Sequence, residues 1–584
     1  MIKTFRYLKP YILSILFIFI LVAARALLDL ALPNYMGQIF DRANDGFSGI
    51  IPVPEARTEI LYLALQMLGI TLASITVTIA GGFLESRVSA KYAKKLREEV
   101  YKKIEQFSLT EIDEITVSSL ITRTTNDIQT VQMSVNMLLR MVILTPFMAV
   151  GAITMALSKQ PSLSMILVAS ISALIILLAT VFILTVPKFG KMQKLVDKQN
   201  LVTRENLKGL KVVRAYNMES FQKEKVSKVA DDSRKLNIFV NRIFTIMWPG
   251  ASLIMGFTGL AMAYFAVKTG IVTVNSQFTG GDLSALIQYS NRTIMSFMML
   301  TNILISIPRA SISAKRIMEV IDKPIVIQNS KDPIVLPENI EGLIEFKDVY
   351  FQYPGSEEPV LSNINFTAKP NEVTAFIGST GSGKSTLINL LPRLYDITSG
   401  EILIDGISIK EIELNSLYEH IGYVPQKGNL FKGTIQSNIG FSDLATEESI
   451  KKAAKIAQAE DFILNYEKQY NQEITQGGSN VSGGQRQRLS IARALASQAK
   501  ILIFDDSFSA LDFKTDKNLR KAIRENIEAT ILIVAQRINT IKDADQIIVL
   551  DQGKIVGIGK HHELLKNCPI YLEIAQSQLS EEEL

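Results

Sequence analysis

A glycine-rich segment, FIGSTGSGKSTLI (residues 376–388), carries the residues of this chain that are best suited to chemistry. It follows a short apolar run typical of a strand and precedes a pattern typical of a helix. Glycines let the backbone curl until successive N–H groups point at phosphate oxygens near the positive end of a helix dipole. Lys384 would reach the β- and γ-phosphates, and the Ser385 hydroxyl would ligate Mg²⁺. A chance glycine-rich turn is the alternative, and the strand–loop–helix setting disfavours it.

The segment therefore predicts a nucleoside triphosphate site. Its candidate contacts are Gly378, Ser379, Thr380, Gly381, Ser382, Gly383, Lys384, Ser385 and Thr386.

Two further segments in the second half of the chain point to the same kind of ligand. The run NVSGGQRQRLSIARAL (480–495) opens an arginine-rich helical pattern with a serine and two glycines, and such a helix N-terminus forms a second anion site. A buried strand pattern at 501–504 ends in Asp505, the carboxylate expected on the Mg²⁺ side of the nucleotide. The candidate contacts of the first run are Ser482, Gly483, Gly484 and Gln485.

Tyr353 and Gln426 complete the candidate nucleotide contacts. Tyr353 ends a run with strand alternation, EGLIEFKDVYFQY, 25 residues before Gly378, where an aromatic ring is well placed to stack on adenine. By itself it would be an ordinary edge-strand tyrosine. Gln426, in GYVPQ, follows another strand-like run. The predicted Mg²⁺ ligands are Ser385, Gln426 and Asp505.

The overall composition conceals two unlike halves. The hydrophobic fraction of 47% averages long apolar runs before about residue 310 and an ordinary α/β pattern beyond about residue 340. A net charge of +5 is too small to argue for a nucleic-acid partner. The single cysteine, Cys568, excludes an intramolecular disulfide and a cysteine-based metal site.

The first half contains six apolar segments that are each long enough, at about 20 residues or more, to cross a bilayer. The first follows a basic start and is too long for the apolar region of a signal peptide, so we interpret it as a retained span. The six segments are 11–33, 59–84, 137–158, 162–186, 243–268 and 284–307.

The charges between the spans predict the orientation. The first ten residues hold three Lys or Arg, segment 85–136 holds eight and segment 187–242 holds fourteen. By the positive-inside rule the N-terminus and both long connections face the cytoplasm, and the chain leaves the sixth span on the side where ATP is. The other connections hold few basic residues. The Lys and Arg residues of 34–58, 159–161 and 269–283 are Arg42, Arg57 and Lys159.

The two long connections have charged and apolar residues interleaved at helical spacing, which predicts that the spans continue as helices into the cytoplasm. Their tips, near 111–118 and 215–222, would then lie far from the bilayer. We predict that these tips dock on a cytoplasmic ATPase domain, the alternative being solvated loops.

Charged residues inside spans need partners or water. Arg25 and Asp29 lie four residues apart on the first span, so we expect them to neutralise each other. Arg292 in the sixth span has no obvious partner and is expected to face a water-filled cavity, in a pathway role or near the headgroups. Three nearby methionines could adapt to varied apolar ligands, or they could simply pack against neighbouring helices or lipid. These are Met295, Met298 and Met299.

The predicted fold class is an α-helical membrane domain of six transmembrane helices with long cytoplasmic extensions, followed by an α/β P-loop ATPase domain. The expected boundaries are 1–310 for the membrane domain, 311–340 for a proline-punctuated linker and 341–584 for the ATPase domain.

The whole chain resembles a half-transporter of the ABC exporter family, most closely the bacterial multidrug exporters built as heterodimers. The resemblance rests on GSTGSGKST and VSGGQ in this order, and on SSLITRTTND (118–127) and ENLKGLKVVRAYNME (205–219). It implies ATP and Mg²⁺ as cofactors. It also implies two ATPase domains closing head to tail, with each ATP between the phosphate loop of one and the signature serine of the other. Ser482 would then serve a nucleotide held mainly by the partner chain.

Three departures from the family pattern bear on mechanism. The position of the catalytic glutamate is Asp506, whose carboxylate is set back by roughly an ångström, an offset that costs on the order of a hundredfold in rate. The position of the switch histidine, in IVAQR, is Gln536, and Gln476 replaces a commonly acidic residue before the signature. The resemblance thus implies a site that holds ATP but splits it slowly, with Asp506 and Gln536 at the degenerate catalytic positions.

The expected function is ATP-driven export of hydrophobic or amphipathic compounds, drugs among them, from a multi-pass position in the bacterial cytoplasmic membrane. The N-terminus and ATPase domain would be cytoplasmic. The expected partners are membrane lipids, a hydrophobic small-molecule substrate and a non-identical half-transporter with intact glutamate and histidine, and no nucleic acid. The alternatives are an ATP-gated channel or regulator and a homodimeric exporter of lipid or peptide.

Overall fold

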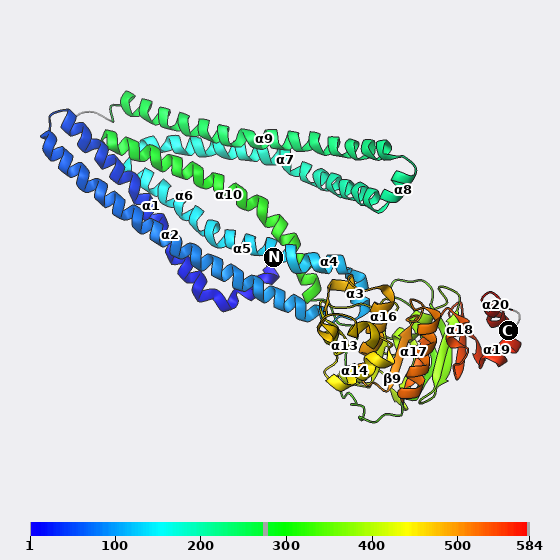
Figure 1. Cartoon of the computed structure of the whole chain (residues 1–584). Coiled ribbons are helices and arrows are strands. Elements are labelled where there is room, and N and C mark those ends of the chain that lie inside the picture. Colours follow the sequence, from blue (N-terminus) through cyan, green and yellow to red (C-terminus); the bar gives the residue numbers. More distant parts are fainter. Residues whose placement is uncertain (1, 272–277, 581–584) are drawn as a thin grey trace. The chain divides into compact units, whose positions relative to one another are not determined.

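The computed structural model describes residues 2–271 and 278–580, which fold into two compact units (Figure 1). Residues 272–277 of the predicted connection 269–283, and 581–584 at the end of the chain, lie outside the described residues. Unit 1 comprises Met1–Ile104 and Ser118–Lys323, and unit 2 comprises Glu105–Val117 and Pro324–Leu584.

Unit 1 consists of helices, as its long apolar runs predict. Among the described residues, six helical stretches are long and apolar enough to cross a membrane, which confirms the six predicted spans. The six are Lys3–Phe47, Val53–Ile104, Val117–Lys159, Pro161–Lys208, Glu219–Lys268 and Gly280–Ile321. Their elements are η1 (Ile2–Tyr11), α1 (Ile12–Phe47), α2 (Val53–Ile104), α4 (Val117–Thr122), η2 (Arg123–Asp127), α5 (Ile128–Met137), η3 (Leu138–Val142), α6 (Ile143–Lys159), α7 (Pro161–Lys208), α8 (Leu210–Ala215), α9 (Glu219–Lys268) and α10 (Gly280–Ile321).

Helix α1 shows how these helices pack. Its buried residues Ile18, Val22, Ala26 and Leu30 recur every fourth position and form one stripe toward α2, α6 and α10. Leu27, on another face of α1, is 66% exposed in this chain. An apolar side chain at such a position is suited to lipid, since a bilayer solvates leucine as well as a protein interior does.

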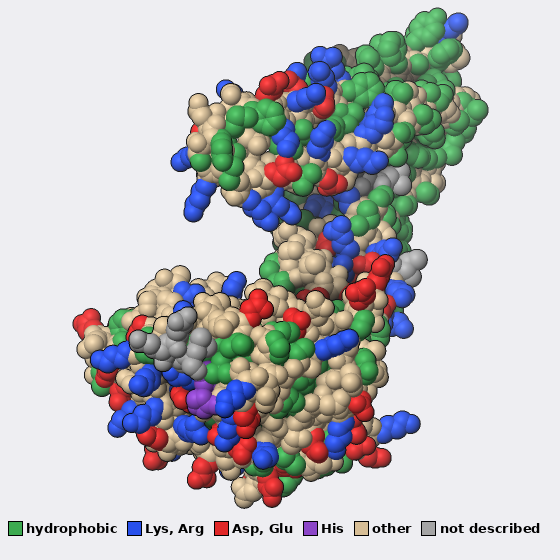
Figure 2. Space-filling view, turned by 90° about the vertical axis from the view of Figure 1, so that its right-hand side faces the viewer, with side chains coloured by type: hydrophobic (Ala, Val, Ile, Leu, Met, Phe, Trp, Pro, Cys, Tyr) green, Lys and Arg blue, Asp and Glu red, His purple; other side chains and the backbone are tan. Residues whose placement is uncertain are grey.

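Several helices continue far beyond their apolar part, which confirms the predicted helical extensions. Helix α2 runs to Ile104, α7 runs to Lys208 and α9 begins at Glu219. Figure 1 shows α7 and α9 side by side with α8 at their end, and the two helices are in contact. Lys and Arg side chains gather over this α8 end in Figure 2, whereas apolar side chains cover the surface farther along unit 1.

Helix α10 extends past the sixth span without a break. Pro308 lies inside it, and the helix ends only at Ile321. A proline inside a helix removes one backbone hydrogen bond, which membrane helices tolerate because neighbouring groups satisfy the carbonyl that is left.

The charged pair in the first span is neutralised as predicted. The Arg25 Nε and Asp29 Oδ2 atoms lie 3.6 Å apart, and Ser74 Oγ of α2 donates a hydrogen bond of 2.6 Å to Asp29 Oδ1. Arg292 is half-buried. Within the described residues its guanidinium has no hydrogen-bond or ion-pair partner.

Unit 2 is an α/β structure built on two main sheets. The six-stranded sheet has the order β12-β11-β3-β10-β9-β6 and is parallel except for β12, and the antiparallel four-stranded sheet has the order β2-β1-β4-β5. The strands are β1 (Ile344–Phe351), β2 (Leu361–Ala368), β3 (Val373–Gly378), β4 (Ser399–Ile404), β5 (Ile407–Ser408), β6 (Ile421–Val424), β7 (Gly433–Thr434), β8 (Glu473–Ile474), β9 (Ile501–Asp505), β10 (Thr530–Val534), β11 (Gln546–Asp551) and β12 (Lys554–Gly559).

Helices cover the larger sheet because its central strands are apolar on both faces: every residue of β9 and of β10 is buried. The helices of unit 2 are α3 (Leu109–Ile115), α11 (Lys384–Leu390), α12 (Leu414–Glu419), α13 (Ile435–Ile439), α14 (Glu447–Ile456), α15 (Glu460–Leu464), η4 (Gln469–Asn471), η5 (Gln476–Gly478), α16 (Gly483–Ala496), α17 (Phe513–Asn526), α18 (Ile538–Ile541), α19 (His561–Asn567) and α20 (Pro569–Gln576).

Helix α3 belongs to unit 2, although it lies in sequence between helices of unit 1. The buried Glu111 carboxylate accepts hydrogen bonds from the Val326 N–H (2.7 Å) and the Ser108 N–H (2.8 Å). Burial pushes the pKa of Glu111 upward, but the hydrogen bonds from Ser108 and Val326 outweigh it and lower the pKa. Tyr395 Oη donates a hydrogen bond of 2.7 Å to Asp113. The first of the two predicted tips therefore packs within unit 2, the predicted ATPase domain, whereas α8 at the second tip belongs to unit 1.

Candidate nucleotide site

The glycine-rich segment forms a loop between β3 and α11, and two of its glycines are required by its geometry. Gly378 has a φ of 156°, and a Cβ there would lie 2.0 Å from the Leu550 carbonyl oxygen. Gly383 has a φ of 97°, and a Cβ there would lie 2.7 Å from Leu361 Cδ2. Any other residue at either position would clash and strain the backbone. We refer to residues 378–386 as the phosphate loop.

Lys384 folds back into the phosphate loop. Its Nζ donates hydrogen bonds to the backbone oxygens of Gly378 (3.0 Å) and Ser379 (2.7 Å). Burial lowers the pKa of Lys384, and the nearby Asp506 and Asp505 carboxylates act in the opposite direction. The ammonium group thus lies in the curl of the loop, where phosphate oxygens would be drawn to it. The loop tip (Ser379, Thr380 and Gly381) is exposed.

Ser385 and Asp505 lie together at the end of β9, as a Mg²⁺ site requires. Ser385 Oγ donates a hydrogen bond of 2.8 Å to Asp505 Oδ1. Burial raises the pKa of Asp505, and the bond from Ser385 partly offsets this. A hydroxyl, a carboxylate and the amide oxygen of Gln426 are oxygen donors, and Mg²⁺ bound to a nucleotide takes few protein ligands. Among the described residues no cluster of three or more His, Cys, Asp or Glu could hold a metal by itself, so phosphate oxygens would complete the coordination.

Asp506 is clamped by two amide side chains. Its Oδ2 accepts hydrogen bonds from Gln536 Nε2 (2.8 Å) and Gln426 Nε2 (3.2 Å). Strands β9 and β10 are parallel neighbours in which Val534 pairs with Asp505, so their carboxyl ends bring Asp506 and Gln536 together. Burial raises the pKa of Asp506, and the bond from Gln426, the charge of Lys384 and the bond from Gln536 oppose the rise. Asp506 also has a φ of 45°, a strained conformation that is common at functional sites.

Tyr353 lies beside the end of the phosphate loop. Its hydroxyl is hydrogen-bonded to that of Thr386 at 3.0 Å, and its ring packs edge-on against Tyr395 with centroids 5.2 Å apart. Because Tyr395 also bonds Asp113 of α3, aromatic contacts join the proposed adenine position to the docked tip. Sequence reasoning missed Tyr395, since a lone tyrosine in a helix-to-loop segment carries no motif.

The signature residues lie at the exposed start of α16, a helix of 14 residues. Ser482 Oγ accepts a hydrogen bond from the Gln485 N–H, and Gln485 Oε1 accepts one from the Ser482 N–H, in a capping box. Gly484 is next to the 509–512 turn, because a Cβ there would lie 3.5 Å from the Ala510 carbonyl oxygen. Within residues 278–580 no hydrogen bond joins Ser482, Gly483, Gly484 or Gln485 to the phosphate loop of the same chain.

The structure thus gathers the phosphate loop, Gln426, Asp505, Asp506 and Gln536 into one site, with Tyr353 at its edge. The signature residues Ser482–Gln485 form a separate group, of which Ser482 and Gly483 are exposed.

Comparison with known proteins assigns the family. A family model described as "ABC transporter" matches residues 361–509, and another described as "ABC transporter transmembrane region" matches residues 15–297. A Mycobacterium tuberculosis protein described as an uncharacterized ABC transporter ATP-binding protein is 35% identical over 579 residues, covering 98% of this chain and 97% of its own. The chain belongs to the ABC transporter family. Six candidate spans among the described residues, followed by an ATPase domain, have the organisation of an ABC exporter half-transporter.

Other relatives of this ABC half-transporter include an ATP-dependent lipid A-core flippase of Syntrophus aciditrophicus. It is 31% identical over 511 residues, which cover 86% of this chain and 83% of the flippase. The solved structure of a bacterial Atm1-family ABC exporter with ATP bound has a TM-score of 0.80 at 24% identity, covering 98% of this chain and 99% of its own. This likeness shows that the fold is that of an ABC exporter, as the sequence resemblance implied.

Proposed function

We propose that this chain is one half of a heterodimeric ABC exporter that moves hydrophobic or amphipathic compounds out across the bacterial cytoplasmic membrane. In this proposal its own phosphate loop belongs to a slow ATP site, and its signature completes the fast site of its partner. The observation that carries the proposal is the clamped Asp506 carboxylate, with an amide donor at 2.8 Å where a proton-transferring imidazole would be needed.

The clamp explains why such a site would be slow. ATP hydrolysis needs a group that positions the attacking water, and a histidine or carboxylate that shares its proton. Asp506 is one methylene short, and both of its amide partners donate to the same oxygen, Oδ2. An amide neither gains nor loses a proton near neutral pH, so Gln536 can hold Asp506 but cannot relay a proton.

Nucleotide binding itself has the groups it needs. Lys384 and the backbone N–H groups of the phosphate loop would hold the phosphates, Tyr353 would stack on adenine, and Ser385, Gln426 and Asp505 would hold Mg²⁺. The metal would neutralise charge on the β- and γ-phosphates when bound. A site that has these groups but only a weak base would bind ATP tightly and cleave it slowly.

The exposed signature supports the second part of the proposal. Ser482 lies at the N-terminus of a 14-residue helix, whose dipole and free N–H groups favour an anion. Since Ser482 has no bond to its own phosphate loop among the described residues, the anion it serves is proposed to be the ATP of the partner chain. That partner would carry glutamate and histidine at the two degenerate positions.

The membrane unit supports an apolar cargo. Positive charges concentrate in the long connections, which by the positive-inside rule supports a cytoplasmic position for the N-terminus and the ATPase unit. The half-buried Arg292 would face the translocation pathway beside Met295 and Met299, both of which are exposed in the single chain. Lipids would surround the remaining apolar faces. The alternative is a homodimeric lipid exporter, and the relative described as a lipid A-core flippase favours the lipid cargo of that alternative.

Purification of the tagged chain from membranes of its own cells tests the proposal. We expect a second, different ABC half-transporter to co-purify in equal amount, with glutamate and histidine at the positions of Asp506 and Gln536. Proteoliposomes of the pair should accumulate a hydrophobic dye when ATP is added outside. Recovery of this chain alone, as a dimer with full transport activity, would instead establish the homodimeric alternative.

A further inference from the structure

A side chain near the end of the described chain holds the segment that carries Gln536. Gln578 follows α20, and its Nε2 donates a hydrogen bond of 2.9 Å to the Gln536 carbonyl oxygen. Its Oε1 accepts one of 2.9 Å from the Ile538 N–H. The single amide thus pairs with two backbone groups that flank Arg537, as a neighbouring strand would. This fixes the position of the backbone on both sides of Arg537.

The same backbone sets the place of the Gln536 side chain. Gln536 Nε2 donates to Asp506 Oδ2, so a shift of the 536–538 backbone would move one of the two amides that clamp this carboxylate. The other amide, Gln426, comes from a different segment and bonds at the longer distance of 3.2 Å.

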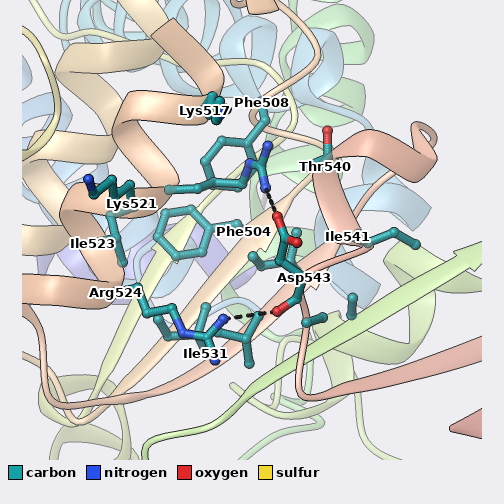
Figure 3. A pocket seen from close by; sticks show the side chains of 15 residues that line it. Phe504, Phe508, Lys517, Lys521, Ile523, Arg524, Ile531, Thr540, Ile541 and Asp543 are labelled. Carbon is teal, nitrogen blue, oxygen red and sulfur yellow. Dashed lines mark hydrogen bonds and ion pairs between the residues drawn. The ribbon is translucent and has the colours of Figure 1, made fainter. Parts of the chain in front are cut away.

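Ile538 begins the short helix α18, and the segment from this helix to Asp543 is also bonded by side chains of α17. Arg520 of α17 donates a hydrogen bond of 3.1 Å to the Asn539 carbonyl oxygen, and Arg524 donates one of 2.9 Å to the Asp543 carbonyl oxygen. Figure 3 shows Arg524 reaching to Asp543. Phe504 and Phe508 line the pocket beside these residues.

That pocket is a cavity of about 380 Å³ lined by side chains of α17, α18 and the sheet, Thr540 and Ile541 of α18 among them. Ile538, Thr540 and Ile541 of α18 are nevertheless buried, so apolar packing fixes the helix itself. The backbone at the start of this helix, which carries Gln536, is the part that the two hydrogen bonds of Gln578 hold. Gln578 provides the contacts nearest to the nucleotide site.

We propose that Gln578 is a positioning residue for the ATP site: it holds Gln536 against Asp506 and so slows release of ATP from this chain. This inference rests on the proposed function, in which Asp506 faces the terminal phosphate. It predicts an effect on ATP but not on ADP, because ADP has no phosphate at that position.

The test is the rate at which fluorescent ATP and ADP analogues leave the purified full-length chain in the presence of Mg²⁺, followed by stopped flow. In Gln578→Ala we expect ATP release about fivefold faster, since two hydrogen bonds are lost, and ADP release unchanged. Gln576→Ala is the matched control, because Gln576 is an exposed glutamine two positions away. Among the described contacts its side chain has no hydrogen bond, and it should match the wild type.

A second comparison separates positioning from a general loss of structure. Gln578→Ala should add nothing to Gln536→Ala, because the first change acts through the residue that the second removes. Gln578→Glu keeps the acceptor for Ile538 but loses the donor, and should give a smaller acceleration. Equal acceleration of ATP and ADP release, additive effects, or unchanged ATP release would each overturn the inference. A wild-type chain that binds no ATP would instead overturn the proposed function.

Discussion

Replacing Asp506 by glutamate together with Gln536 by histidine should raise the rate of ATP cleavage at this chain's own site about a hundredfold. The longer carboxylate moves toward the attacking water, and the imidazole replaces an amide that only donates to Oδ2 at 2.8 Å. The measurement is single-turnover hydrolysis of radiolabelled ATP by the purified chain assembled with its partner. The partner carries a substitution of the lysine in its own phosphate loop, so that the second ATP site is inactive.

Asp506→Asn is the matched control for this gain. It keeps the length of the side chain but removes the charge, so hydrolysis should not rise above the wild-type level. The single change Asp506→Glu should give only part of the increase, because the amide at 536 remains. Unchanged cleavage in the double variant, with ATP still bound, would show that the slow rate has another cause.

The second large effect concerns the signature. In the assembled exporter, Ser482→Ala should lower steady-state ATP hydrolysis about a hundredfold, whereas Lys384→Ala should lower it less than about tenfold. The serine and the N-terminus of α16 would contact the nucleotide that is cleaved. Lys384 would instead hold the second ATP, which is mainly retained. The two effects should therefore differ, although Ser482 and Lys384 both belong to phosphate-binding elements of the same chain.

Ser497→Ala provides a control at the opposite end of the same helix, because Ser497 is the residue that follows the C-terminus of α16 and its Oγ donates a hydrogen bond to the Ala494 carbonyl oxygen. It should leave turnover unchanged. If Lys384→Ala proved the more damaging variant, the assignment of slow and fast sites to the two chains would have to be reversed.

Much of this arrangement could be predicted because it depends on local pattern. The phosphate loop joins a buried strand to a helix, and the positive φ of Gly383 needs a residue without a Cβ, so the spacing of glycines reveals the loop. The spans could be predicted because about 20 apolar residues are needed to cross a bilayer. The Arg25 and Asp29 pair could be predicted because four residues make one turn of a helix.

Contacts between distant segments could not be predicted in this way. Tyr395 meets Asp113 across 282 positions, and Gln578 meets Gln536 across 42, so neither bond leaves a periodic signal. The substitutions at 506 and 536 could be recognised one by one through the family pattern. The family pattern does not reveal that Gln426 and Gln536 donate to the same carboxylate oxygen. This arrangement depends on the alignment of β9 and β10 and on the path of the segment after β6.

The central claim is that this chain holds ATP but depends on an unlike partner for turnover. Steady-state ATPase activity of the purified full-length chain, measured alone and again with the co-purified partner, tests it most directly. The account predicts nearly no turnover by the chain alone, despite measurable ATP binding, and vigorous turnover by the pair. Rapid hydrolysis by the isolated chain, at a rate that the partner does not raise, would contradict it.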